Sequence, residues 1–287
     1  IVSAMGKTTN AMEKVVSNYF DAKHELHSSV QEVKKFHNNI LLDLFENETH
    51  AVFENIDDLF QELLQFFDHN KSPNYNFVYD QVIGFGELIS TSIISHYLNH
   101  IGLSNSWLDV RNCIKTDDYY RNAKVHWNQT QELISKKVDT SKLNITQGFI
   151  GSNSNNFTTT LGREGSDYTA AIFAFCLNAK SVTIWKDVPG VLNADPRYFK
   201  NAELLSRISY TEAIELSYYG ASVIHPKTLQ PLQRKEIPLL VKSFLNPKNE
   251  GTIVGKDLKL TPEVPCYILK QNQILISLSS LDFSYIV

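Results

Sequence analysis

The sequence predicts an α/β protein, a three-layer α/β/α sandwich with a mainly parallel sheet. Short apolar stretches with strand character alternate with segments whose apolar residues recur at helical spacing, from residue 1 to about residue 244. Such alternation places helices on both faces of a mainly parallel sheet. The chain has 287 residues, of which 43% are hydrophobic, and is therefore long enough to bury a full core.

The first part of the chain is predicted to be mostly helical. Residues 1–3 have the character of a buried strand end, and a helix over 11–20 follows a set of N-cap residue types, Thr8, Thr9 and Asn10. Helical character continues from 21 to about 70, as an excursion from the sheet. Its buried faces would be formed by Leu41, Leu42, Leu44, Phe45, Phe60, Leu63, Leu64 and Phe67.

The rest of the chain alternates between helices and strands. In order, the predicted elements are a helix over 87–100, a strand over 107–110, a helix over 128–137, strands over 143–150 and 157–160, a helix over 166–179, a strand over 181–185, helices from about 210 and 226, and a strand over 239–244. The polar residues 151–156 predict a turn that joins the strands beside them in a hairpin. Near 262–265 the pattern changes, and strand-like alternation at 274–279 predicts the opening of a second domain.

Charge and cysteine usage exclude several classes of function. A net charge of −4 gives no general attraction for nucleic acid or for an anionic membrane. There is no signal peptide, and no apolar run is long enough to cross a bilayer. The three cysteines form no C-x-x-C pair, which favours a reducing, cytoplasmic setting without a zinc site.

A glycine-containing loop at 162–167 leads directly into an apolar helix. The N-terminus of a buried helix can hold an anion, because its free N–H groups and its dipole point outward. Arg163 adds a forked cation suited to a carboxylate or a phosphate. An ordinary loop in which Ser166 or Asp167 caps the helix explains these residues equally well.

Two further stretches carry charges at positions where ligands bind. Lys186 and Asp187 follow a predicted strand and precede Asp195 and Arg197, and open α/β sheets bind ligands at the carboxyl ends of their strands. On local chemistry alone, a solvated loop is the favoured interpretation of these charges. Glu87 follows two glycines in the predicted first turn of a helix, where it would cap the helix or hold a substrate ammonium, and capping is the favoured interpretation on local grounds.

Motifs of the commonest nucleotide-binding and hydrolytic enzymes are missing. The sequence contains no G-x-x-x-x-G-K-[ST] loop, protein-kinase signature or G-x-S-x-G elbow. Pairs of histidines at helical spacing lack a third metal ligand. The residues by themselves therefore indicate an anion-binding α/β domain without naming the anion.

Several ordered motifs, spread over nearly the whole chain, resemble those of aspartate kinases in the amino acid kinase family. They are VSAMGKTTN at 2–10, GELIS at 86–90, ITQGFIG at 145–151, TTTLGREGSDY at 158–168, DVPG at 187–190, DPR at 195–197, LSYYGA at 216–221 and HP at 225–226. The resemblance implies an amino acid kinase domain over 1–260, with a helical insertion at about 21–80. It also implies that a truncated α+β ACT regulatory domain opens over 265–287.

The resemblance implies transfer of the γ-phosphoryl group of ATP to the β-carboxylate of L-aspartate, the first step of lysine, threonine and methionine biosynthesis. Mg²⁺ would be held mainly by the ATP phosphates. Lysine or threonine would act as an effector, and ACT domains would join copies of the chain into a homo-oligomer. Two alternatives are another amino acid kinase, acting on glutamate, acetylglutamate or a nucleotide, and a non-catalytic effector-binding relative.

The resemblance also implies roles for individual residues. The aspartate pocket would be lined by Ser3, Thr9, Glu87, Phe149, Arg163 and Ser166. Arg163 would bind the α-carboxylate, Glu87 would lie near the ammonium, and Asp167 would organise the reaction centre. ATP would be bound by Lys186, Asp187, Leu192, Asp195, Arg197 and Ser222, and no residue would bind a metal directly.

The chain departs from the family pattern in two places. Family members open with a strand ending in Lys-Phe-Gly-Gly-Thr-Ser, which meets the transferring phosphate and is absent here, so these residues alone are expected to be inactive or nearly so. Lys186 and Ser222 stand where the family commonly has threonine and lysine. Either Lys186 supplies the nucleotide-side cation that Ser222 cannot, or both are solvent-facing substitutions.

Overall fold

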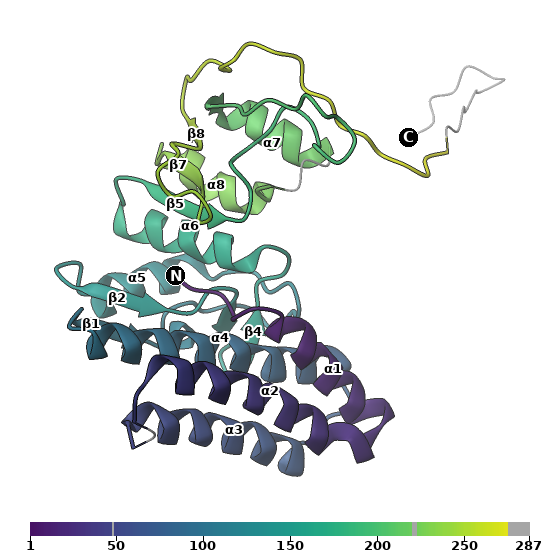
Figure 1. Ribbon diagram of the computed structural model, residues 1–287, viewed down its shortest axis with the longest axis vertical. Coiled ribbons are helices and arrows are strands. Elements are labelled where there is room, and N and C mark those ends of the chain that lie inside the picture. Colours follow the sequence, from purple (N-terminus) through teal and green to yellow (C-terminus); the bar gives the residue numbers. More distant parts are fainter. Residues whose placement is uncertain (48, 220–222, 275–287) are drawn as a thin grey trace.

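The computed structural model describes residues 1–47, 49–219 and 223–274 (Figure 1). Four helices open the chain, namely α1 (Thr8–Asp21), α2 (Lys23–Leu44), α3 (Ala51–His69) and α4 (Tyr75–His100). Helices α2 and α3 lie on the outer side of α1 and α4 (Figure 1). The helical character predicted for residues 21 to about 70 is therefore confirmed, as two long helices.

The buried faces of these helices follow the sequence pattern with one exception. Leu41, Phe45, Phe60 and Leu63 are buried in the core, as their spacing predicts. Leu42 is 50% exposed, so its prediction as a core residue is wrong. Successive residues of a helix point about 100° apart, and Leu42 therefore faces away from the core that Leu41 joins.

Helix α4 begins twelve residues before its predicted start. The side chain of Asn74 caps it by accepting hydrogen bonds from the N–H groups of residues 76 and 77, at 3.0 and 3.2 Å. A Cβ atom at Gly84 would lie 3.0 Å from Thr158, and one at Gly86 would lie 3.1 Å from Thr8. The two glycines thus allow close packing inside the helix. Glu87 is not in a first turn, and both its predicted position and the capping interpretation are wrong.

The first four strands form the middle layer of a three-layer arrangement. These are β1 (Asn105–Leu108), β2 (Leu143–Thr146), β3 (Ile150–Ser152) and β4 (Thr158–Thr160). Strands β1 and β2 pair in parallel, while β3 and β4 form the predicted antiparallel hairpin. They lie between α4 on one side and α5 (Trp127–Lys137) and α6 (Gly165–Leu177) on the other (Figure 1). A short 3₁₀ helix, Val110–Asn112, follows β1.

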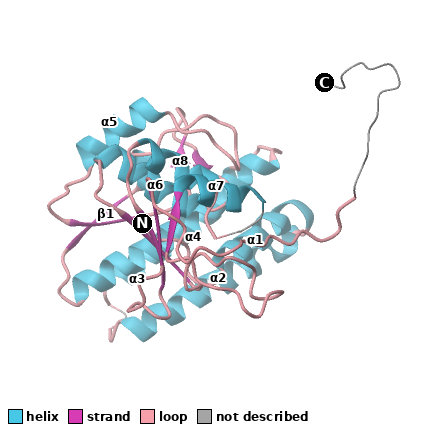
Figure 2. Ribbon diagram, turned by 90° about the horizontal axis from the view of Figure 1, so that it is seen from above, coloured by secondary structure: helices cyan, strands magenta, loops and turns pink. Residues whose placement is uncertain are grey.

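A four-stranded sheet has the strand order β5-β7-β8-β6. Its strands are β5 (Val182–Lys186), β7 (Leu239–Ser243), β8 (Thr252–Gly255) and β6 (Arg207–Ser209). The pairs β5–β7 and β6–β8 are parallel, and β7–β8 is antiparallel. Helices α7 (Tyr210–Tyr219) and α8 (Pro226–Arg234) accompany this sheet, and strands run through the middle of the molecule with helices on both sides (Figure 2). The predicted α/β class with mainly parallel strands is confirmed, although β6 and β8 were not predicted.

Helix α6 is shared by both hydrophobic cores. Ile172, Phe173 and Cys176 pack into the core formed with the N-terminal helices. Ala171 and Ala174 pack into the core formed with the four-stranded sheet. Because α6 is buried from both sides, its N-terminus is held at the junction of the two parts of the fold.

The last described residues, 265–274, form no strand and make a single isolated bridge, between Ala194 and Tyr267. Most of the predicted opening of a second domain, 275–287, lies outside the described residues, so the domain boundaries stay a prediction. Within the part of the chain that the structure describes, no helix is both long and apolar enough to cross a membrane.

Candidate functional site

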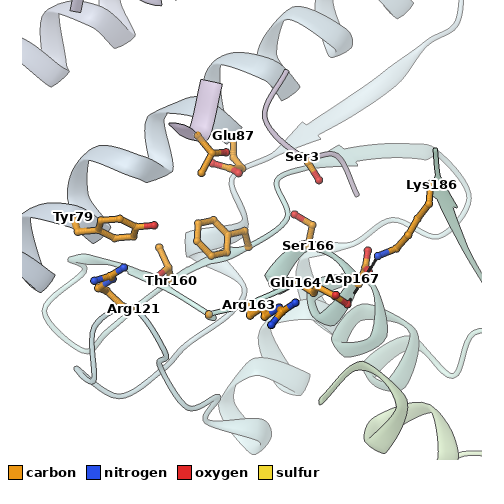
Figure 3. A pocket seen from close by; sticks show the side chains of 14 residues that line it. Ser3, Tyr79, Glu87, Arg121, Thr160, Arg163, Glu164, Ser166, Asp167 and Lys186 are labelled. Carbon is orange, nitrogen blue, oxygen red and sulfur yellow. Dashed lines mark ion pairs between the residues drawn. The ribbon is translucent and has the colours of Figure 1, made fainter. Parts of the chain in front are cut away.

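A pocket of about 450 Å³ opens where the carboxyl ends of several strands meet the N-terminus of α6 (Figure 3). Its lining includes every residue that the sequence predicted for the aspartate pocket, namely Ser3, Thr9, Glu87, Phe149, Arg163 and Ser166. Asp167 and Lys186 line the same pocket. The fold thus brings together residues that are spread over nearly two hundred positions of the sequence.

The first residues of the chain are held between β2 and α4. The N–H of Val2 donates to the carbonyl of Thr146 at 3.0 Å, and the N–H of Gly148 donates to the carbonyl of Val2 at 2.9 Å. The hydroxyl of Ser90, on α4, donates to the carbonyl of Ser3 at 2.7 Å. These hydrogen bonds place Ser3 at the mouth of the pocket.

The loop after β2 is clamped against the first turn of α6. Phe149 has a φ of 68°, in the left-handed region where side chains other than glycine are strained. Its N–H donates to the hydroxyl of Thr169 at 3.0 Å. A Cβ at Gly148 would lie 2.5 Å from Ser166, and one at Gly165 would lie 2.5 Å from the Phe149 ring. Both glycines are therefore required for this close approach.

The N-terminus of α6 has no side-chain cap. Glu164 precedes the helix in a left-handed conformation, with a φ of 52°, and Ser166 and Asp167 lie inside the first turn. The interpretation of Ser166 or Asp167 as the N-cap is therefore wrong. Arg163 precedes this turn, and no carboxylate among residues 1–47, 49–219 and 223–274 forms an ion pair with it. An uncapped helix N-terminus beside an available guanidinium can bind an anion.

Glu87 is a buried carboxyl group on the opposite wall. The residue is 3% exposed, and its Oε2 atom has no hydrogen-bond partner within the described structure. Burial raises the pKa of Glu87 to about 8, although hydrogen bonds from its own backbone and that of Ala4 act in the other direction. A cationic group in the pocket would satisfy the open oxygen and favour the carboxylate form.

Lys186 connects β5 to the N-terminus of α6. Its ammonium lies 2.9 Å from a carboxylate oxygen of Asp167 and 3.9 Å from one of Glu164. The side chain of Lys186 is only 21% exposed, so the interpretation of Lys186 as a solvent-facing substitution is wrong. Two carboxylates hold this cation at the pocket wall (Figure 3).

Four residues that the sequence did not single out also line the pocket, Tyr79, Arg121, Thr160 and Glu164. Thr160 and Glu164 lie within the motif at 158–168, which gave a signal for their neighbourhood. Tyr79 lies in the part of α4 that was not predicted. Arg121 lies in a polar loop without any motif.

A second pocket, of about 470 Å³, collects Leu192, Asp195 and Arg197 from the predicted nucleotide site. The Arg197 guanidinium donates to Asp195 from Nε at 3.0 Å and from Nη2 at 2.6 Å, and these hydrogen bonds lower the pKa of Asp195. Asp187 is exposed and lines neither pocket. Ser222 lies outside the described residues.

The residues that line the second pocket have the chemistry to hold a nucleotide. Leu192 and Leu216 offer apolar surface for a base, and Arg197 offers a cation for phosphates. Direct ligation of a metal by side chains needs a group of carboxylate, histidine or cysteine ligands. In the described ranges, no group of three or more His, Cys, Asp or Glu residues could hold a metal ion.

Comparisons with known proteins agree with the geometry. The model of the amino acid kinase family matches residues 1–243. Lysine-sensitive aspartokinase 3 of Escherichia coli (strain K12) is 40% identical over 207 residues, which cover 71% of this chain and 46% of the relative. Bifunctional aspartokinase/homoserine dehydrogenase 2, chloroplastic, of Arabidopsis thaliana is 33% identical over 292 residues, which cover 96% of this chain and 32% of the relative.

A solved structure gives the same result. The crystal structure of E. coli aspartokinase III in complex with aspartate and ADP superposes with a TM-score of 0.82 at 33% sequence identity. The match covers 89% of this chain and 57% of that chain. The chain thus spans between 32% and 57% of the length of these three proteins.

Proposed function

The chain belongs to the amino acid kinase family, and we propose that the protein containing it is an ATP-dependent aspartate kinase. The reaction would transfer the γ-phosphoryl group of ATP to the β-carboxylate of L-aspartate, giving ADP and 4-phospho-L-aspartate. The support from relatives is the 40% identity to an aspartokinase and the likeness to an aspartokinase solved with aspartate and ADP. The support from the molecule is the chemistry of the first pocket.

The observation that carries the proposal is the convergence of three kinds of group in this pocket. Arg163 offers a guanidinium for an α-carboxylate, and Glu87 offers a buried carboxyl group for an ammonium. Lys186 and the N-terminus of α6 offer positive potential for a second carboxylate and for the phosphoryl group that it receives. An amino acid with two carboxylates complements all three.

The proposed reaction needs no strong general base. The side chain of aspartate has a pKa of about 3.9 and is therefore already an anionic nucleophile at neutral pH. The task of the protein is to position this carboxylate and to stabilise the charge that develops during phosphoryl transfer. Asp167 would orient Lys186 for that purpose, while Ser3, Thr9, Phe149 and Ser166 would shape the pocket around the substrate.

We propose that the second pocket binds the nucleotide. Arg197, oriented by Asp195, would bind phosphate oxygens, and Leu192 would contact the base or ribose. Asp187 and Ser222 stay predicted members of the nucleotide site on the resemblance alone. Bound ATP would supply the phosphoryl group, and Mg²⁺, held mainly by its phosphates, would neutralise their charge. Lys186 lines the first pocket, and the lining of the second pocket begins two residues later in the chain, at Val188. Lys186 would therefore serve as the cation between substrate and nucleotide.

The wider context of the enzyme follows from the same proposal. The reaction would begin lysine, threonine and methionine biosynthesis, and lysine or threonine would inhibit it, as the name of the lysine-sensitive E. coli relative suggests. ACT domains would join copies into a homo-oligomer. We also infer a cytoplasmic location, because the free thiols of Cys113, Cys176 and Cys266 are preserved in a reducing compartment.

The test is trapping of the acyl phosphate with hydroxylamine in the intact natural protein that contains this chain. ATP and L-aspartate should give aspartyl hydroxamate, and L-glutamate should give little product. Efficient turnover of glutamate instead would identify another amino acid kinase. Binding of lysine or threonine without any phosphoryl transfer would identify the non-catalytic relative.

A further inference from the structure

Arg121 stands in an unusual backbone conformation at the rim of the first pocket. Its φ is 68°, in the left-handed region that arginine seldom adopts. Its N–H donates to both carboxylate oxygens of Asp80, at 3.1 and 3.0 Å. Asp80 is fully buried and also accepts from the N–H and the hydroxyl of Thr160, each at 2.8 Å. A buried carboxylate thus ties the loop of Arg121 to α4 and β4, and this network maintains the strained conformation.

The side chain of Arg121 is held by Tyr79, and its positive charge also acts on the buried carboxylate of Asp80. Its guanidinium carbon lies 4.3 Å from the centroid of the Tyr79 ring, and the Tyr79 hydroxyl donates to Glu13 at 2.8 Å. In the part of the chain that the structure describes, no carboxylate forms an ion pair with this guanidinium. Stacking fixes the plane of the group, and the N–H groups that do not contact the Tyr79 hydroxyl can bind a ligand.

The loops that carry Arg121 and Arg163 are in contact. A Cβ at Gly162, the residue before Arg163, would lie 3.3 Å from the carbonyl oxygen of Arg121 and 2.8 Å from the side chain of Asn122. Gly162 has a φ of 83°, so its conformation also requires glycine. Two guanidinium groups that form no ion pair in the described structure therefore line one pocket from adjoining loops.

The two ends of the pocket differ in chemistry (Figure 3). Lys186 and Asp167 lie at one end, Tyr79 and Arg121 lie at the other, and Arg163 lies between them. In the proposed function, phosphoryl transfer occurs at the Lys186 end, where Lys186 and the N-terminus of α6 offer positive potential for the reacting carboxylate and the phosphoryl group. Arg121 therefore faces the end of the substrate that does not react.

We propose that Arg121 is a specificity-determining residue, which binds the α-carboxylate of the acidic amino acid together with Arg163. This inference rests on the proposed function and extends it. Two guanidinium groups can surround a carboxylate more completely than one, and the fixed stacking on Tyr79 reduces the entropy that binding would remove. Substrates without this carboxylate would leave Arg121 unpaired and would gain nothing from it.

The experiment compares two ligands in the intact natural protein by isothermal titration calorimetry. L-aspartate carries the α-carboxylate, whereas L-aspartic acid 1-amide retains the ammonium and the β-carboxylate but replaces the α-carboxylate by an amide. The variants are Arg121→Gly and Arg121→Asn, because glycine and asparagine tolerate the left-handed backbone. Circular dichroism of each variant verifies that it folds.

We expect both variants to bind L-aspartate about tenfold more weakly or worse, and the 1-amide less than about twofold more weakly. Equal losses for the two ligands, or no loss for L-aspartate, would overturn the role of Arg121 while leaving the proposed function intact. If the unchanged protein fails to bind L-aspartate, the proposed function falls and this inference falls with it. If one variant is unfolded, the same comparison of the two ligands is made with the other variant.

Discussion

The ammonium of Lys186 lies 2.9 Å from the carboxylate of Asp167, and this ion pair joins the end of β5 to the first turn of α6. It links the two parts of the chain in the wall of the first pocket. A lysine held in this way is preorganised, because its position is set before any ligand binds. A change at Lys186 should therefore affect the reaction more than it affects the fold.

Replacing Lys186 should impair phosphoryl transfer. We expect Lys186→Met, in the intact natural protein, to lower kcat on the order of a hundredfold, because a preorganised charge at the transferring group is lost. Lys186→Arg retains the charge and should be affected much less. Steady-state kinetics with varied ATP would measure kcat and the KM for ATP. An unchanged kcat together with an unchanged KM for ATP would show that Lys186 has no part in the reaction.

The affinity for aspartate should depend on pH through Glu87. Burial raises the pKa of Glu87 to about 8, so this carboxyl group is mostly protonated at pH 7 in the free protein. Only the carboxylate form attracts an ammonium, and binding of L-aspartate should therefore strengthen as pH rises from 6 toward 8. Calorimetric titrations between pH 6 and pH 8 would measure how steeply the affinity for L-aspartate changes with pH. Glu87→Gln should bind more weakly and should lose the slope, whereas a Glu87→Gln profile that parallels the unchanged protein would exclude this role.

The same pKa makes a prediction about stability. The folded-state pKa of Glu87 is raised above the ordinary value of 4.5, so the folded protein binds the proton more tightly than the unfolded chain does. The contribution of this group to the free energy of unfolding is therefore complete below pH 4.5 and is lost as pH rises toward 8. Urea denaturation of the Glu87→Gln variant should show a smaller decline over this interval. An identical decline would mean that Glu87 titrates normally.

Packing between Gly165 and Phe149 should be sensitive to a single methyl group. A Cβ at Gly165 would lie 2.5 Å from the Phe149 ring and 3.1 Å from its Cα. We expect Gly165→Ala to lower the free energy of unfolding by about 1–3 kcal/mol and to weaken binding of L-aspartate. Gly102→Ala is the control, since Gly102 has no atom within 4 Å of its Cβ position, while its φ of 87° is positive and that of Gly165 is not. If Gly165→Ala costs no more than the control, the loop is not clamped as described.

The sequence predicted the long elements and the motif residues of the site better than the short elements. Helices such as α1 and α5 have clear periodicity, whereas β6 and β8 have three and four residues, too few for any period to appear. The glycines of α4 are locally typical of a helix start, and only the packing of Thr8 and Thr158 against them reveals their use inside the helix.

Arg121 shows why part of the site could not be predicted. Its backbone is held by Asp80, forty-one positions earlier, and its side chain by Tyr79, so neither partner is a sequence neighbour. A polar loop containing an arginine is ordinarily a solvated surface feature. Only the three-dimensional arrangement distinguishes this arginine from the others.

The most direct test of the central claim, that the first pocket binds aspartate for phosphorylation, is the rate of aspartyl hydroxamate formation by the intact natural protein and its Arg163→Ala variant. We predict efficient formation by the unchanged protein and a loss of kcat/KM for L-aspartate on the order of a hundredfold or more in the variant, with the KM for ATP nearly unchanged. A variant that phosphorylates aspartate as efficiently as the unchanged protein would contradict the claim.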